Sequence, residues 1–238
     1  MTDKMRLDKL LAQRGVGSRS MVRKLIRRGQ VTVDGEVAQR PEMSVDAAMA
    51  ICVDDQVIDA PPLVVIWHKP IGVVSTMRDP HGRHDLSDAL PAQYREHLHP
   101  VGRLDAETTG LLLFSRSGSL TQWLLHPKRA IQRRYEAGVE VDVASTLKET
   151  LANGVATSLG TFTADVEYSA GRTVRLGVRE GKHRMVRRLL ANSGHPVESL
   201  HRLSYGPFQL GELPVSECRI ATDDELKWLA ENQAPLDN

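Results

Sequence analysis

The sequence has few of the residues that disulfide frameworks, metal clusters and membrane spans require. Its 238 residues include only two cysteines, Cys52 and Cys218, which are too distant for a CxxC metal motif. No apolar run approaches the about 20 residues of a membrane-spanning helix, and the charged N-terminal stretch lacks the apolar segment of a secretory signal. We therefore expect a cytoplasmic protein with no metal site.

Aromatic residues and net charge are also scarce. Aromatic residues make up 4% of the chain, too few for a surface that stacks many successive bases of single-stranded nucleic acid. The formal net charge is +1, which excludes a uniformly basic coat that would bind any nucleic acid.

The charges that are present are unevenly distributed. The first thirty residues hold nine Lys and Arg against two Asp, whereas residues 31–62 hold one Arg against seven Asp and Glu. Two more basic clusters lie at 128–134 and 182–188. A basic face beside acidic flanks can steer a polyanion to one surface. The alternative is that these runs are only solvated helix faces.

Spacing of apolar residues predicts two domains. The first, residues 1–60, has helices at 5–14 and 19–28, with Ser18 as N-cap, and a hairpin over 31–37 that turns at Asp34-Gly35. A proline-rich linker at 61–63 follows. The second domain, 64–238, has strands at 63–67, 111–114, 135–141, 161–168 and 174–178 and helices at 119–125, 145–152, 183–192 and 223–231. We expect an α+β fold with a mixed, mainly antiparallel sheet flanked by helices.

The N-terminal segments RLDKLL, SR and VTVDG resemble the αL-type RNA-binding domain found in a ribosomal protein and in several RNA-modifying enzymes. The resemblance implies contacts between the second helix and RNA phosphates, which add affinity without reading sequence. The residues expected to make these contacts are Arg6, Lys9, Arg19, Arg23, Lys24, Arg27 and Arg28.

A second motif is the stretch HPVGRLDAETTGLLL, residues 99–113. Alone, its Arg103 and Asp105 could be an ordinary structural ion pair. Its order with Lys69-Pro70 upstream, Arg133-Arg134-Tyr135 downstream and EGKHRMVRRL at 180–189 resembles the RsuA-type family of ribosomal RNA pseudouridine synthases over nearly the whole chain.

That resemblance implies roles for particular residues. Asp105 would be the nucleophile, and Arg103 or Arg187 would keep its carboxylate charged. Tyr135 would stack on a flipped-out target base. The remaining cations expected to contact RNA are Lys69, Arg133, Arg134, Lys182, Arg184 and Arg188.

The sequence thus predicts an enzyme that isomerises uridine to pseudouridine in ribosomal RNA, without a cofactor and as a monomer. The stretches TTGL and VESLHR most resemble the family member that acts on small-subunit RNA, and this resemblance slightly favours small-subunit RNA as the substrate. Two alternatives stay open: a non-catalytic RNA-binding or ribosome-assembly factor on the same scaffold, and a hydrolase that pairs Asp105 with Glu107. A metal site is not expected at His81, His84, His97 and His99, because no cysteine ligand lies near them in the sequence.

Overall fold

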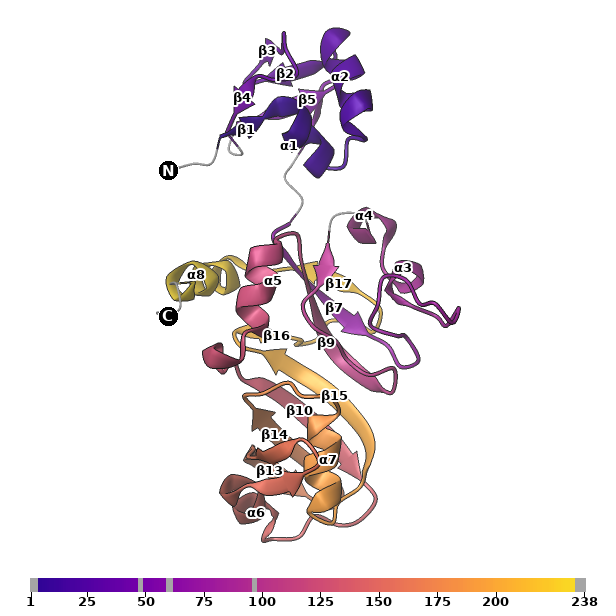
Figure 1. Cartoon of the computed structure of the whole chain (residues 1–238), viewed down its shortest axis with the longest axis vertical. Helices are drawn as coiled ribbons and strands as arrows, with labels where there is room; N and C mark the ends of the chain where they lie inside the picture. The colour runs from indigo at the N-terminus through magenta and orange to yellow at the C-terminus, as the bar shows by residue number, and fades with distance from the viewer. Residues whose placement is uncertain (1–3, 47–48, 59–61, 96–97, 234–238) are drawn as a thin grey trace. The chain divides into compact units, whose positions relative to one another are not determined.

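The computed structural model describes residues 4–46, 49–58, 62–95 and 98–233 (Figure 1). The chain divides into two compact units: unit 1 is Met1–Pro62 with Ala92–His97, and unit 2 is Leu63–Pro91 with Leu98–Asn238. Of the predicted linker, Pro61 lies outside the described residues. In the part of the chain that the structure describes, no helix is both long and apolar enough to span a membrane.

Unit 1 packs helices against short strands. Its elements are β1 (Met5–Arg6), α1 (Leu7–Gln13), α2 (Arg19–Arg27), β2 (Val31–Val33), β3 (Glu36–Val37), β4 (Ser44–Val45), β5 (Ile51–Val53), β6 (Gln56–Val57) and α4 (Ala92–Arg95). The strands β3, β2, β5 and β6 form one sheet in that order, and β1 pairs with β4. Asp34 and Gly35 both have positive φ, the geometry of the tight hairpin turn that the sequence predicts between β2 and β3.

Helix α2 begins where the sequence predicts, because the Ser18 Oγ accepts a hydrogen bond from the Met21 amide at 3.3 Å. Its buried side chains, Val22 and Ile26, pack with Leu7, Leu10 and Leu11 of the first helix region. The basic residues of α2 are therefore left on its outer faces.

Unit 2 is built on one large sheet with strand order β13-β14-β10-β15-β9-β7-β17. The strands are β7 (Val64–Lys69), β8 (His99–Pro100), β9 (Thr108–Ser115), β10 (Arg133–Val139), β13 (Asp165–Ala170), β14 (Thr173–Val178), β15 (Val197–Tyr205), β16 (Phe208–Gln209) and β17 (Cys218–Ile220). Strands β15 and β9 pair in parallel, and the other pairings of this sheet are antiparallel. The predicted α+β class with a mixed, mainly antiparallel sheet is confirmed.

Helices lie along this sheet (Figure 1). They are α3 (Leu86–Ala89), α5 (Gly118–Leu125), the 3-10 turn η1 (Pro127–Arg129), α6 (Leu147–Asn153), α7 (Met185–Asn192) and α8 (Asp223–Asn232). A separate hairpin joins β11 (Val155–Thr157) to β12 (Gly160–Phe162). Apolar residues of β7, β9 and α5 pack with Tyr205 and Phe208 into the main core of the unit.

Several local predictions differ from the structure; the helix predicted at 5–14, for example, begins at Leu7 after the strand β1. The single strand predicted at 161–168 is two strands, β12 and β13, because the amide of Ala164 donates to the carbonyl of Leu151 and the chain turns there. The helix predicted at 183–192 begins at Met185, since Arg184 has left-handed backbone angles. Strand β15 was not predicted as a strand, because its polar residues hide the alternation expected of a strand.

Candidate active site

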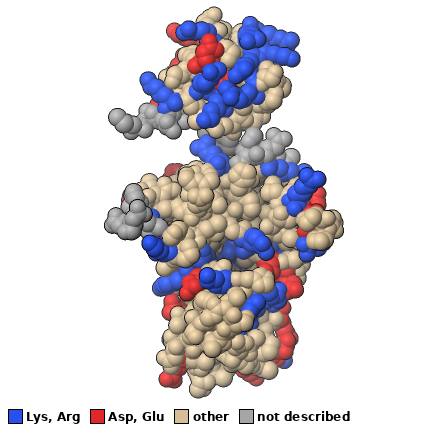
Figure 2. All heavy atoms as spheres, in the orientation of Figure 1, with Lys and Arg blue, Asp and Glu red and all other residues tan. Residues whose placement is uncertain are grey.

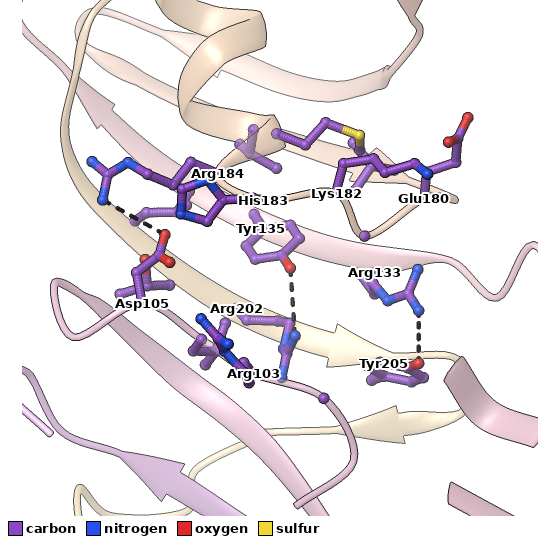
Figure 3. A pocket seen from close by; sticks show the side chains of 18 of the residues that line it. Arg103, Asp105, Arg133, Tyr135, Glu180, Lys182, His183, Arg184, Arg202 and Tyr205 are labelled. Atoms are coloured by element: carbon purple, nitrogen blue, oxygen red, sulfur yellow. Dashed lines mark hydrogen bonds and ion pairs between the residues drawn. The ribbon is translucent and has the colours of Figure 1, made fainter. Parts of the chain in front are cut away.

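Unit 2 contains a cavity of about 480 Å³ beside the centre of the large sheet. Its lining comes from strands β10 and β15, from the loop at 101–108 that leads into β9, and from the segment 178–186 that leads into α7 (Figure 3). Neighbouring strands thus bring together residues that are up to about a hundred positions apart in the sequence.

Asp105 lies on the loop at the edge of this cavity. Its side chain is 27% exposed, and its Oδ2 lies 3.8 Å from Nη1 of Arg184. The loop is fixed on both sides of the carboxylate: Ser75 Oγ bonds the carbonyl and the amide of Leu104 at 2.6 and 3.1 Å, and the amide of Thr108 donates to the Asp105 carbonyl at 3.0 Å. A carboxylate held in this way can meet a substrate without reorganising its backbone.

Lys69 supports the same loop from beneath. Its Nζ donates to the carbonyls of Pro70, Ala106 and Thr108 at 3.0, 3.3 and 3.0 Å, and its side chain is fully buried. Burial lowers the pKa of Lys69 to about 8, although the charge of Asp105 acts in the opposite direction. All three donors are used inside the protein, so the predicted RNA contact is corrected to a structural role.

Tyr135 is almost completely buried in β10, on the wall of the cavity. Its hydroxyl accepts a hydrogen bond from Nη1 of Arg202 at 3.5 Å, a bond that Figure 3 marks. Strand register explains the contact, since Tyr135 pairs with Arg202 across β10 and β15. The ring can offer a flat apolar surface to a base that enters the cavity.

Arg202 and Tyr205 are site residues that sequence reasoning missed. Arg202 is buried, and its Nε donates to the carbonyl of Leu111 at 2.7 Å. The Tyr205 hydroxyl accepts from Nη2 of Arg133 at 2.7 Å, and the Arg133 guanidinium carbon lies 4.6 Å from the Tyr205 ring centre. The only sequence signal for these residues is the stretch VESLHR, whose polar side chains mask the apolar alternation of a strand.

Arg103 and Arg187 occupy different positions relative to Asp105. Arg103 is exposed and lines the cavity. Arg187 does not line it: Nη1 donates to the Val197 carbonyl at 3.2 Å and Nη2 to the Glu107 carbonyl at 3.3 Å. Burial lowers the pKa of Arg187, and the charge of Arg184 acts in the same direction.

The other predicted RNA-binding residues lie on surfaces. Arg134 pairs with Glu167, Arg188 contacts Ser158, and Lys182 is exposed at the cavity edge. In unit 1, Lys9, Lys24, Arg27 and Arg28 are exposed, whereas Arg6, Arg19 and Arg23 bond to Asp8. Lys and Arg side chains gather over much of the unit 1 face that Figure 2 shows.

Among the described residues, no group of three or more His, Cys, Asp and Glu side chains could hold a metal ion. His97, one of the histidines considered for such a site, lies outside them. Glu107 does not line the cavity that Asp105 lines, and its Oε2 accepts from Nη1 and Nη2 of Arg184 at 3.1 Å, so the two acids are not placed as a catalytic carboxylate pair. The cavity is lined by the carboxylates of Asp105 and Glu180, by several cations, and by the rings of Tyr135, His183 and Tyr205.

Residues 63–223 match the family model for RNA pseudouridylate synthase, and residues 5–51 match the S4 domain. The chain belongs to the RNA pseudouridylate synthase family. This confirms the resemblance seen in the sequence, and the S4 match agrees with the αL-type N-terminal segment. The chain is accordingly an enzyme that isomerises uridine in RNA.

Relatives of this synthase cover most of its length. An uncharacterized RNA pseudouridine synthase of Mycobacterium bovis is 36% identical over 94% of this chain and 92% of its own. The ribosomal large subunit pseudouridine synthase B of Vibrio cholerae is 37% identical over 84% of this chain and 66% of its own, and that of Pseudomonas aeruginosa is 37% identical over 95% and 62%. A crystal structure of a pseudouridylate synthase superposes with a TM-score of 0.64 at 27% identity, over 94% of this chain and 98% of its own.

Proposed function

We propose that this synthase isomerises a specific uridine of ribosomal RNA and that Asp105 is its nucleophile. The observation that carries the proposal is the Asp105 carboxylate itself: it is partly exposed at the edge of a cavity, held on a braced loop, and faces a guanidinium. Other described carboxylates that line this cavity are limited to Glu180, which comes from the opposite segment.

The reaction follows from these groups. A carboxylate oxygen of Asp105 bonds to C1′ as the N1–C1′ bond of the uridine breaks. The freed uracil turns against the Tyr135 ring, C5 then bonds to C1′, and the carboxylate is released. C5 loses one proton and N1 gains one, so atoms and charge balance without a cofactor.

Names of relatives support the large ribosomal subunit as the source of the substrate. Both synthases named above are designated for that subunit, although they are longer than the part this chain matches. We therefore place the target in large-subunit RNA, in place of the small-subunit preference drawn from TTGL and VESLHR. The rRNA would contact the exposed Lys and Arg side chains of unit 1. We place the boundary between the two domains at 61–63. We also propose that the protein acts as a monomer, since Asp105 and Tyr135, the groups that the reaction uses, line the same cavity.

Asp105→Asn tests the nucleophile. The amide cannot attack C1′, so pseudouridine formation on rRNA should fall by at least ~10³-fold while unfolding and rRNA binding stay near those of the wild type. A chemical label specific for pseudouridine, mapped along both rRNAs, measures the product and its position.

Retained activity in Asp105→Asn would contradict the nucleophile assignment. Pseudouridine formed by the protein in small-subunit RNA would contradict only the large-subunit assignment. If the wild-type protein binds rRNA but forms no pseudouridine at any position, the binding-only alternative is favoured.

A further inference from the structure

A carboxylate can act as nucleophile only while it is ionised, so the cation beside Asp105 matters to the reaction proposed above. Four cationic side chains come from the elements around it. They are Lys69 below the loop, Arg103 on the loop, and Arg184 and Arg187 at the start of α7. The family resemblance implies Arg187 or Arg103 for this role.

The structure favours a different residue. Among the described residues, Arg184 makes the ion pair with Asp105, at 3.8 Å between Nη1 and Oδ2 (Figure 3). Arg187 spends Nη1 and Nη2 on the main-chain carbonyls of Val197 and Glu107, which ties α7 to β15 and to the loop. The Nζ of Lys69 likewise donates all of its hydrogen bonds to main-chain carbonyls.

The backbone of Arg184 is also unusual. It caps α7 with φ 53° and ψ 29°, a left-handed conformation that a residue with a Cβ rarely adopts. Such strained residues persist only where surrounding contacts hold them, and they cluster at functional sites. Here the conformation accompanies a side chain that crosses from α7 to the Asp105 loop.

Glu107 supplies the holding contact. Its Oε2 accepts from both Nη1 and Nη2 of Arg184 at 3.1 Å, and it lies 4.0 Å from Nε of Arg187. Asp105 and Glu107, which lie on the same loop, therefore both contact the guanidinium of Arg184. Neither the motif nor its spacing revealed this arrangement, because Arg184 is 77 residues from Glu107.

We propose that Arg184 is the counter-ion of the Asp105 nucleophile and that Glu107 is a positioning residue which holds Arg184 in place. Arg187 then has the separate task of joining α7 to the loop backbone. This proposal rests on Asp105 being the nucleophile.

The test compares kcat and KM for five variants of the full chain acting on an rRNA fragment. Arg184→Met should lower kcat about 100-fold with KM changed little, because a preorganised cation beside the reacting group is lost. Arg184→Lys should recover part of this loss, because it restores a positive charge beside the carboxylate, and Glu107→Gln should lower kcat by about tenfold.

Arg188→Met is the matched comparison, since it removes a neighbouring positive charge of α7 that contacts Ser158 instead of the loop. It should raise KM and leave kcat nearly unchanged. Methionine at 184 keeps the Cβ of arginine, so the strain of the positive φ remains while the bonds to Glu107 are lost. Thermal unfolding measures the resulting loss of stability, and kcat is compared at a temperature at which every variant is folded.

Two results would overturn the proposal. One is an Arg184→Met variant in which only KM rises, which would make Arg184 a phosphate contact. The other is an Arg187→Met variant that loses kcat about 100-fold while Arg184→Met does not. Full activity of Asp105→Asn in the same assay would instead refute the nucleophile assignment.

Discussion

At the scale of the residue, Asp8 organises the charge of unit 1. Its carboxylate is fully buried and accepts from Arg6 at 3.1 Å, Arg19 at 3.1 Å and Arg23 at 2.8 Å. Burial alone would raise the pKa of Asp8, but the hydrogen bonds from Arg6, Arg23 and Arg19 outweigh it and hold this pKa well below its usual range. Three half-exposed guanidiniums are thereby fixed around one anion.

Asp8→Asn should destabilise the protein by about 3 kcal/mol at pH 7, the lower part of the range for breaking a buried pair, because the arginines can still turn to water. The native pKa is lowered, so the stabilisation is complete above the unfolded value of about 3.9 and is lost as pH falls below it. Urea unfolding at pH 7, 5 and 3 measures the difference between wild type and variant, which should narrow at pH 3.

Glu36→Gln is the control, an exposed carboxylate of the same unit whose loss should change stability by less than about 0.5 kcal/mol. Equal stability of Asp8→Asn and wild type at pH 7 would refute the role of Asp8.

The basic stripe of α2 was predictable from helical spacing. Its acidic organiser was not, because Asp8 and Arg23 meet only when α1 packs on α2.

At the scale of the element, the site depends on the parallel pairing of β9 with β15. Gly110 faces Arg202 across this pair and has φ +100°. A Cβ at position 110 would lie 2.4 Å from the Arg202 carbonyl oxygen and 2.6 Å from its amide nitrogen. Only glycine allows the two backbones to approach so closely.

Gly110→Ala should therefore destabilise unit 2 by about 2 kcal/mol or more, since both the clash and the positive φ oppose it. It should also lower kcat, because β15 carries Arg202, the partner of Tyr135. Thermal unfolding and kcat on rRNA are the measurements. Gly118→Ala, at the first residue of α5 with open space around it, should be neutral or slightly stabilising. Similar effects at both positions would contradict the argument.

Elements were predictable from sequence where one side of the strand or helix faces the core. Strands β7, β9, β10 and β14 were expected within a few residues of their bounds. The missed strand, β15, alternates buried and half-exposed positions, but its buried set includes Arg202 and Ser204. A strand whose inner face lines a polar cavity lacks the apolar signature that local pattern analysis requires.

At the scale of the whole molecule, the charge is polarised although the total is +1. Lys24, Arg27 and Arg28 are exposed on or beside the last turn of α2, where phosphate contacts would release counterions. The charge of each segment was predictable from the sequence. The sequence did not predict which basic side chains of unit 1 are held by Asp8.

Replacing Lys24, Arg27 and Arg28 together by Ala should weaken rRNA binding and raise KM, with kcat nearly unchanged. The slope of log KM against log salt concentration should fall by about 2 to 3, roughly one for each lost phosphate contact. Steady-state kinetics from 50 to 300 mM salt would measure it. The control is the double variant Lys148→Ala, Lys227→Ala, which removes exposed lysines of unit 2 and should leave the slope unaltered. An unaltered slope in the triple variant would exclude α2 from the RNA contact.

The pairing of β7 with β17 sets the order in which the protein can fold during its synthesis. Residues 64–67 of β7 are all buried, yet their edge partners at 218–220 leave the ribosome about 150 residues later. At roughly 5–20 residues per second, that apolar edge waits roughly 8–30 s for its partner. The sheet and core of unit 1, which need only the first 58 residues, can close before then. The nascent chain therefore passes through a state with a finished leading domain and an unfinished trailing sheet, the stage at which it most needs protection from aggregation.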